Sequence, residues 1–215
     1  PTPQPATPTA VAAVIEEMIK HFDWKGKVGC GFPTPLQHGT CQSGGNLHPE
    51  WKGTKVDTLF KKRTGNSYYI VNDADAAGLA EINFGAGKDV AGVVIMITLG
   101  TGIGTGIFLD GHLLPNSELG HVLYKNGKIF EKYAADSARK REGLSRNAWG
   151  KRLHKYFSHI EFLLSPDLFI VGGGASKKLG KFSQEIKIKT PIVAAQAENE
   201  AGIIGAAMAA KYGLK

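Results

Sequence analysis

Apolar residues recur at the spacing of an amphipathic helix in two stretches of the chain, 9–19 and 146–164. Thr9 and Ser145 are suitable N-caps for these helices. The second stretch has one almost wholly apolar face, while its opposite face is basic. The apolar positions are Trp149, Leu153, Tyr156, Phe157, Ile160, Leu163 and Leu164. Shorter helices are predicted at 56–64, from Asp73 onward, at 131–142 and at 198–211.

Short apolar runs bounded by Gly, Pro, Asn or Asp are typical of strands. Such runs occupy 27–33, 68–71, 93–99, 107–109, 112–114 and 167–171. Residues 36–47, rich in Gly, Ser and Asn, predict an irregular hairpin. Because strands and helices alternate along the chain, the fold class is α/β.

A glycine-containing break at 85–89 separates two parts of this pattern. We predict a domain boundary near residue 88. The smaller domain comprises 1–87 together with the C-terminal helix, 198–215. The larger domain, 88–197, carries the glycine-rich loops and the basic helices.

Composition is ordinary for a globular protein, with 42% apolar and 21% charged residues. The longest apolar run, 93–99, is far shorter than the ~20 residues that span a bilayer. The first residues resemble no signal peptide, and Cys30 and Cys41 do not amount to a disulfide framework. We therefore expect a cytoplasmic protein without a membrane partner.

The net charge of +7 is concentrated in one region. Residues 125–155 contain ten basic and three acidic side chains, an excess that equals the net charge of the whole chain. A basic helical face attracts polyanions, although an ordinary solvated face has the same composition. Trp149, Tyr156 and Phe157 lie on the apolar face rather than among the charges, so stacking on nucleic-acid bases is not expected.

Glycine occupies every second position from Gly100 to Gly106. The spacing does not match Gly-x-Gly-x-x-Gly, because Thr105 stands where the third glycine is needed, and no P-loop Gly-Lys-Ser/Thr follows. Apolar runs on both sides predict a strand-loop-strand with a turn at 110–111. Exposed main-chain N–H groups and the hydroxyls of nearby threonines would suit a phosphate, but a tightly packed sheet bend is an equally good explanation.

Polar residues stand where several strands end. Asn72 and Asp73 follow the 68–71 strand and begin a helix, where an Asp is often only a cap. Glu118 and His121 follow the glycine hairpin, and Glu131 comes ten residues after His121. The carboxyl ends of strands in an α/β sheet are the usual place for a ligand.

The order of these motifs resembles the repressor–open reading frame–kinase (ROK) group of sugar kinases, and within it the polyphosphate glucokinases. The motifs are Gly31-x-Pro33, 72–74, 99–104, 118–121, Glu131-x-Tyr133-Ala134, 171–174 and 199–207. Residues 146–174 carry the likeness to the polyphosphate branch. The resemblance covers nearly the whole chain.

The resemblance implies an actin-like ATPase (ribonuclease H-like) fold of two domains, with glucose between them. Asp73 matches the general base that deprotonates the sugar 6-hydroxyl. Sugar ligands are expected at Asn72, Glu118, His121, Glu131 and, less securely, Asn46. Phosphate-side loops are expected at Gly100, Thr101, Gly102 and Gly104, and at Gly172, Gly173 and Gly174.

Two departures from the family pattern are visible. Residues 122–130 lack the cysteines of the family's zinc site, so we predict no zinc. The N-terminal hairpin with Asp-x-Gly-Gly-Thr/Ser, which the family uses to bind phosphate, is missing from this sequence. We therefore expect the chain as given to be impaired.

The expected reaction is transfer of a phosphoryl group from polyphosphate, with ATP as a second candidate donor, to the 6-hydroxyl of glucose, with Mg²⁺ accompanying the donor. A polyphosphate track is predicted at Arg139, Lys140, Arg141, Lys151, Arg152 and Lys155. The alternatives are an ATP-only glucokinase and a non-catalytic sugar sensor of a ROK-type repressor. A homodimer is expected, and no nucleic-acid partner.

Overall fold

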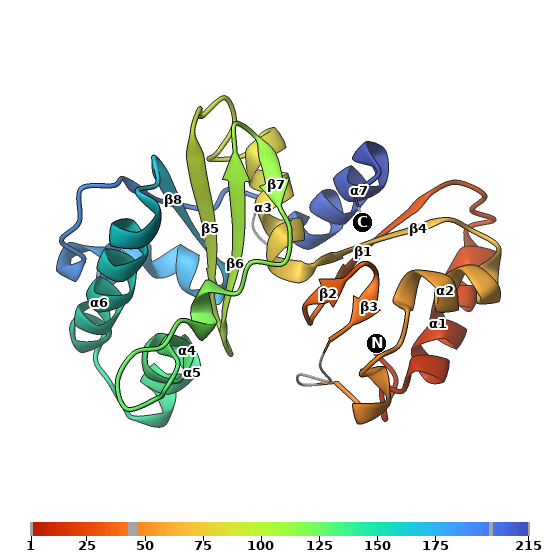
Figure 1. The fold of residues 1–215 in the computed structure, drawn as a ribbon, viewed down its shortest axis with the longest axis horizontal. Coiled ribbons are helices and arrows are strands. Elements are labelled where there is room, and N and C mark those ends of the chain that lie inside the picture. Colours follow the sequence, from red (N-terminus) through yellow and green to blue (C-terminus); the bar gives the residue numbers. More distant parts are fainter. Residues whose placement is uncertain (1, 43–46, 198–199, 215) are drawn as a thin grey trace.

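The computed structural model describes residues 2–42, 47–197 and 200–214. Two sheets lie on either side of a central pair of helices, α3 (Asp73–Phe84) and α7 (Ala201–Tyr212) (Figure 1). The predicted boundary near 88 falls in the connection from α3 to the larger sheet. The division into two domains stays a prediction.

The smaller sheet pairs β1 (Val28–Phe32) with β4 (Tyr68–Asn72) in parallel. Tyr68 and Ile70 point to a core that also includes α1 (Pro8–His21) and α2 (Val56–Thr64), whereas Val71 belongs to the core around α3 and α7. This division follows from the alternation of side chains along a strand. The predicted hairpin is present as β2 (Leu36–Gln37) and β3 (Thr40–Cys41), followed by η1 (Pro49–Trp51).

The larger sheet has the strand order β7-β6-β5-β8-β9. Its strands are β5 (Val93–Leu99), β6 (Ile103–Leu109), β7 (His112–Leu114), β8 (Leu168–Gly172) and β9 (Ile192–Ala194). β5, β6 and β7 form the predicted antiparallel hairpins, although β6 begins at Ile103 rather than at the predicted 107. β8 and β9 continue the sheet in parallel with β5. The carboxyl ends of β5 and β8 therefore open at the same edge.

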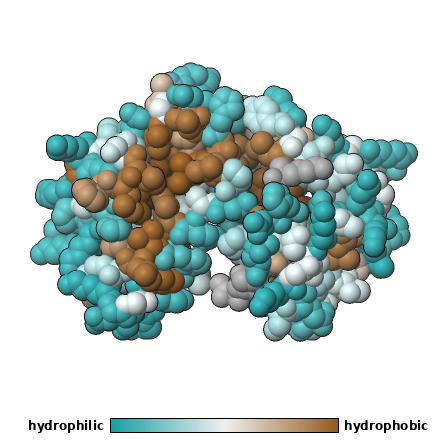
Figure 2. Space-filling view, in the orientation of Figure 1, coloured by the Kyte–Doolittle hydropathy of each residue, from teal (hydrophilic) through white to brown (hydrophobic). Residues whose placement is uncertain are grey.

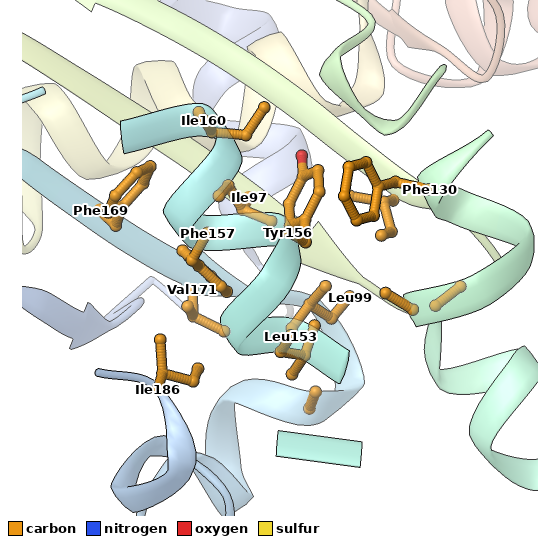
Figure 3. Packing of buried hydrophobic residues seen from close by; sticks show 14 of the residues in the cluster. Ile97, Leu99, Phe130, Leu153, Tyr156, Phe157, Ile160, Phe169, Val171 and Ile186 are labelled. Atoms are coloured by element: carbon orange, nitrogen blue, oxygen red, sulfur yellow. The ribbon is translucent and has the colours of Figure 1, made fainter. Parts of the chain in front are cut away.

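Helix α6 (Arg146–Leu164) covers one face of this sheet. Figure 3 shows Leu153, Tyr156 and Phe157 of this helix packed with side chains of β5 and β8. The opposite face, carrying Val94 and Met96, packs on α3 and α7. The predicted amphipathic helix and its Ser145 N-cap are confirmed, because Ser145 Oγ accepts the N–H of Ala148 at 3.2 Å.

Helix α7 packs closely against both α3 and β1. A side chain at Gly205 would overlap the carbonyl of Ala76 on α3, and one at Gly29 would overlap the carbonyl of Ala206 on α7. The small residues of this helix therefore permit contact between backbones, which joins the two sides of the molecule.

Three of the predicted helices need correction. The first helix begins at Pro8 with Thr7 as its N-cap, not at Thr9, because proline is favoured in the first helical turn. The predicted helix 131–142 is two short helices, α4 (Phe130–Ala134) and α5 (Asp136–Arg141), separated by the extended backbone of Ala135. The last helix begins at Ala201 rather than 198.

Three short 3₁₀ segments complete the described chain: η2 (Leu119–His121), η3 (Gly173–Lys181) and η4 (Ser183–Glu185). Cys30 and Cys41 each carry a thiol and are not joined in a disulfide. Within the described ranges, every helix is too short or too polar to cross a membrane.

Candidate active site

The junction of β4 and α3 presents Asp73 at the start of a helix. Asn72 provides the cap, since its Oδ1 accepts the N–H of Ala74 at 2.8 Å and its side chain is buried. The Asp73 side chain remains open to solvent. Neighbouring atoms displace enough water to raise its pKa above the ordinary value, although the N–H groups of Ala74 and Asp73 oppose the shift. The cap and the candidate base are therefore different residues.

Glu118 and His121 lie at the two ends of η2. Glu118 Oε2 is 3.7 Å from His121 Nδ1. Partial burial raises the pKa of Glu118; His121 lowers it, and the negative charges of Glu131 and Asp73 raise it further. Glu131 and Asp73 are therefore close enough to Glu118 for their charges to act on it. Such a set of acceptors suits a polyhydroxylated ligand.

Glu131 has a second role that the sequence did not indicate. From the start of α4, its Oε2 accepts the N–H of Ile103 at 3.1 Å, and its Oε1 is 3.5 Å from Lys132 Nζ. A side chain at Gly102 would collide with the Glu131 carboxylate. Glu131 therefore fixes the glycine-rich turn as well as facing the candidate sugar region.

The turn between β5 and β6 is tight. Gly100 N–H donates to the Gly102 carbonyl at 3.0 Å, and the Ser137 side chain donates to the Thr101 carbonyl at 2.6 Å. A side chain at Gly104 would collide with Thr98 and Ala74. Close packing thus explains why positions 102 and 104 are glycine. A side chain at Gly100, in contrast, would extend into open space. The phosphate-binding role of Gly100, Thr101, Gly102 and Gly104 stays a prediction.

A pocket of about 290 Å³ brings the candidate base to the second glycine loop. It lies where β4, β5 and β8 end and where α7 begins. Its lining includes Asp73, Thr98, Gly172, Gly173, Gly174, Ser176, Ala201 and Gly202. Gly173 has a φ of 73°, which favours glycine, and a side chain there would crowd the backbone of Leu99.

The sequence analysis missed two parts of this pocket. The first is Ser176, whose hydroxyl donates to the Gly173 carbonyl at 2.9 Å. The second is the N-terminus of α7, where Ala201 and Gly202 line the pocket. Helix N-termini attract phosphate groups through unpaired N–H groups and the helix dipole. Gly202, the fifth residue of the predicted helix 198–211 and the second of α7, was the available signal.

The six basic residues of the predicted track have different surroundings. Asp136 pairs with Arg139 at 2.6 Å and with Lys140 at 3.1 Å. Glu142 pairs with both Arg141 and Arg152. Four of the six therefore already have a carboxylate partner.

Lys151 and Lys155 project from the exposed face of α6. Lys155 Nζ lies 3.4 Å from the hydroxyls of both Tyr124 and Tyr133, whose rings stack at 4.4 Å. Neither lysine has an acidic partner within the described ranges. These two are the track residues most able to bind an added anion.

Two further predictions concern ligands. Asn46, predicted as a sugar ligand, lies outside the described residues. Among the residues that are described, no group of three or more His, Cys, Asp or Glu side chains could hold a metal ion. The expected absence of zinc stays a prediction.

Comparisons with known proteins agree with this arrangement. Residues 1–138 match the model of the ROK family. A polyphosphate glucokinase of Mycobacterium tuberculosis is 44% identical over 209 residues, which cover 97% of this chain and 78% of that protein.

Two solved structures are also similar. The inorganic polyphosphate/ATP-glucomannokinase of Arthrobacter sp. strain KM is 45% identical, with a TM-score of 0.89 over 99% of this chain and 87% of that one. A ROK family glucokinase of Streptomyces griseus, solved with glucose and AMPPNP, has a TM-score of 0.79 at 22% identity over 98% and 90% of the two chains. The expected actin-like fold is thereby confirmed.

The family match covers more than half of the chain, and the mycobacterial relative extends the likeness to nearly all of it. The resemblance stated from the motifs is therefore confirmed, and this chain belongs to the ROK family.

Proposed function

We propose that this chain is a glucokinase that transfers a phosphoryl group from inorganic polyphosphate, and from ATP, to the 6-hydroxyl of glucose. The observation that carries the proposal is the pocket in which Asp73 lies with Gly172, Gly173 and Gly174. The mycobacterial and Arthrobacter relatives, whose names specify polyphosphate, support the choice of donor.

Asp73 acts as the general base. Its carboxylate accepts the proton of the 6-hydroxyl as the oxygen attacks the terminal phosphorus of the donor. The raised pKa supports this role, because a stronger base takes the proton more readily. Asn72, Glu118, His121 and Glu131 hold the other hydroxyls, and their number orients the ring.

The donor phosphates lie against Gly172, Gly173 and Gly174 and the start of α7, with Gly100 to Gly104 as the second loop. Mg²⁺ accompanies the donor and offsets its negative charge. Asp73 is the single carboxylate among the residues that line the described pocket. Such a lining suits an ion whose other ligands are phosphate oxygens and water.

A polyphosphate chain extends beyond this pocket along the basic surface. Lys151 and Lys155 contribute most, since the other four track residues share their charge with Asp136 or Glu142. ATP does not need these lysines. Polyphosphate use should therefore depend more strongly on salt concentration than ATP use does.

The active form is a cytoplasmic homodimer. Figure 2 shows a band of apolar residues across the face where β5 and β6 lie. Leu109 ends β6 and Leu114 ends β7, the strand at the edge of this sheet, and each is more than half exposed. An apolar patch of this kind favours association with a second copy, which light scattering would detect as a doubled mass.

The direct test measures glucose 6-phosphate formation with Mg²⁺ and either polyphosphate or ATP, alongside glucose binding by calorimetry. We expect product with polyphosphate. Product with ATP alone would support the ATP-only glucokinase. Glucose binding without product from either donor would support the sugar sensor, and the absence of glucose binding would overturn the proposal.

A further inference from the structure

Asp75 is a buried carboxyl group that the proposed chemistry does not use. It lies two residues after Asp73 on α3, with 1% of its surface exposed. Its Oδ2 accepts the backbone N–H of Asn116 at 2.9 Å. Its Oδ1 has no hydrogen-bond partner within the part of the chain that the structure describes. A buried group of this kind is costly to keep, so its position calls for a structural reason.

Asn116 connects Asp75 to the other side of the molecule. Its side-chain Oδ1 accepts the backbone N–H of Leu36, the first residue of β2, at 3.2 Å. Asn116 has a φ of 62°, in the left-handed region that asparagine tolerates better than most residues. The backbone of this one residue is thus held by α3, and its side chain holds the β2–β3 hairpin.

The two hydrogen bonds join three segments around the candidate sugar region. Asp75 belongs to the helix that begins with Asp73, and Asn116 precedes Glu118 by two residues. Leu36 belongs to the hairpin of the smaller sheet. Residues 75 and 116 are far apart in sequence, so no local turn sets the spacing of these segments.

The cavity beside the Asp75–Asn116–Leu36 bridge is too small to hold a sugar. It measures about 50 Å³ and is lined mainly by apolar residues around Asp75 and Asn116. Ligand sites for small molecules are several times larger, roughly 300 Å³ or more. Neither Asp75 nor Asn116 lines the pocket that holds Asp73.

We propose that Asp75 and Asn116 are positioning residues that hold the Asp73, Glu118 and β2–β3 segments at the spacing the acceptor sugar requires. This inference rests on the proposed glucokinase function. Loss of the bridge weakens sugar binding, because part of the binding energy must then order the segments. Turnover at saturating glucose changes little, since Asp73 and the donor pocket remain.

The test compares two matched pairs of variants by glucose calorimetry. Asn116→Gly tolerates the left-handed backbone and removes only the side-chain acceptor. Its control is Asn126→Gly, at another left-handed asparagine, with a φ of 54°, in a different loop. Asp75→Ala removes the acceptor for the Asn116 N–H, whereas Asp75→Asn retains an oxygen at that position.

We expect Asn116→Gly and Asp75→Ala each to weaken glucose binding about fivefold, as the loss of one hydrogen bond predicts. Asp75→Asn and Asn126→Gly should bind within about twofold of the unmodified chain, by the same conversion. Hydrogen exchange at the Leu36 amide should accelerate in Asn116→Gly and not in Asn126→Gly. This second measurement reports the bridge even where activity is low.

The outcomes separate this inference from the proposed function. If the unmodified chain binds glucose and all four variants bind equally well, the positioning role is wrong while the glucokinase proposal stands. If the unmodified chain binds no glucose, the proposed function fails first. If Asn126→Gly loses as much glucose affinity as Asn116→Gly, the effect comes from added loop flexibility rather than from the lost hydrogen bond. That result would overturn the inference.

Discussion

Helices α6 and α3 both pack on the larger sheet, yet they are built in opposite ways. α6 buries large side chains such as Trp149 and Tyr156 on one face and exposes lysines on the other. α3 is buried on most sides, has alanine at four of its twelve positions, and carries two buried carboxyl groups, Asp75 and Glu81. Helix α6 contributes mainly to the core, whereas α3 begins with Asp73, the residue proposed as the general base.

The two buried carboxyl groups of α3 differ in the number of hydrogen bonds that they accept. Glu81 Oε1 accepts the N–H groups of Gln196 and Ala197 at 2.8 and 2.7 Å, and its Oε2 accepts that of Ala86 at 2.8 Å. Asp75 has one such bond. A carboxylate paired at both oxygens organises the chain around it, whereas a half-paired one is sensitive to pH.

The largest expected effect is on stability, at Glu81. Glu81→Ala should lower the free energy of unfolding by roughly 3–5 kcal/mol, because three backbone N–H groups lose their acceptor. Trp149→Ala on α6 should cost a similar amount through lost packing. Urea unfolding monitored by circular dichroism would measure both. A loss below about 1 kcal/mol for Glu81→Ala would show that water replaces the carboxylate readily.

A smaller effect should appear at Asp75, and it should depend on pH. Burial raises the pKa of Asp75 to about 7 in the folded chain, from 3.8. The folded state therefore retains a proton that the unfolded state releases, so stability falls as the pH rises between about 4 and 7. Above pH 7 Asp75 is ionised in the folded state as well, and the free energy of unfolding carries the full cost of burying this charge.

Asp75→Asn does not titrate and should escape this cost. Relative to the unmodified chain, its free energy of unfolding should rise by about 2 kcal/mol between pH 5 and pH 8. Urea titrations at the two pH values would measure the difference. A pH-independent difference would mean that Asp75 is ionised throughout this range.

The smallest effect should come from the exposed face of α6. Replacing Lys151 and Lys155 with glutamine should weaken polyphosphate use about threefold to tenfold, as the loss of two exposed phosphate contacts predicts, and leave ATP use nearly unchanged. The matched control replaces Arg139 and Lys140, which Asp136 already pairs. Initial rates at several salt concentrations would compare the donors. An equal loss with both donors would contradict a polyphosphate track on this face.

The pattern in the sequence was sufficient to predict α6 from Arg146 to Leu164, because its apolar stripe follows the helical period. It also predicted where β4 ends and α3 begins, because an apolar strand there meets an Asn-Asp cap. It did not predict the break between α4 and α5 at Ala135. Near this break, the Ser137 N–H donates to the Gly100 carbonyl and Glu131 accepts the N–H of Ile103, so both residues are bonded to the glycine-rich turn. Tertiary contacts overrode the local helical pattern there.

Within the site, the sequence identified residues but not their connections. Asp73 and Gly172 were predicted separately, and the shared pocket required the fold. The Asp75–Asn116 contact has no signal in a pattern, since it joins residues 41 positions apart. Two of the glycines predicted to suit phosphate, Gly102 and Gly104, also have a packing reason, which spacing alone could not reveal.

The most direct test of the account is a comparison of Asp73→Asn with the unmodified chain, in glucose calorimetry and in glucose 6-phosphate formation from polyphosphate. We predict nearly unchanged glucose affinity and turnover reduced by a factor on the order of 10² or more, because the variant lacks the base but keeps the sugar contacts. Unchanged turnover would contradict the assignment of Asp73, and with it the reading of the pocket as the place where the phosphoryl group is transferred.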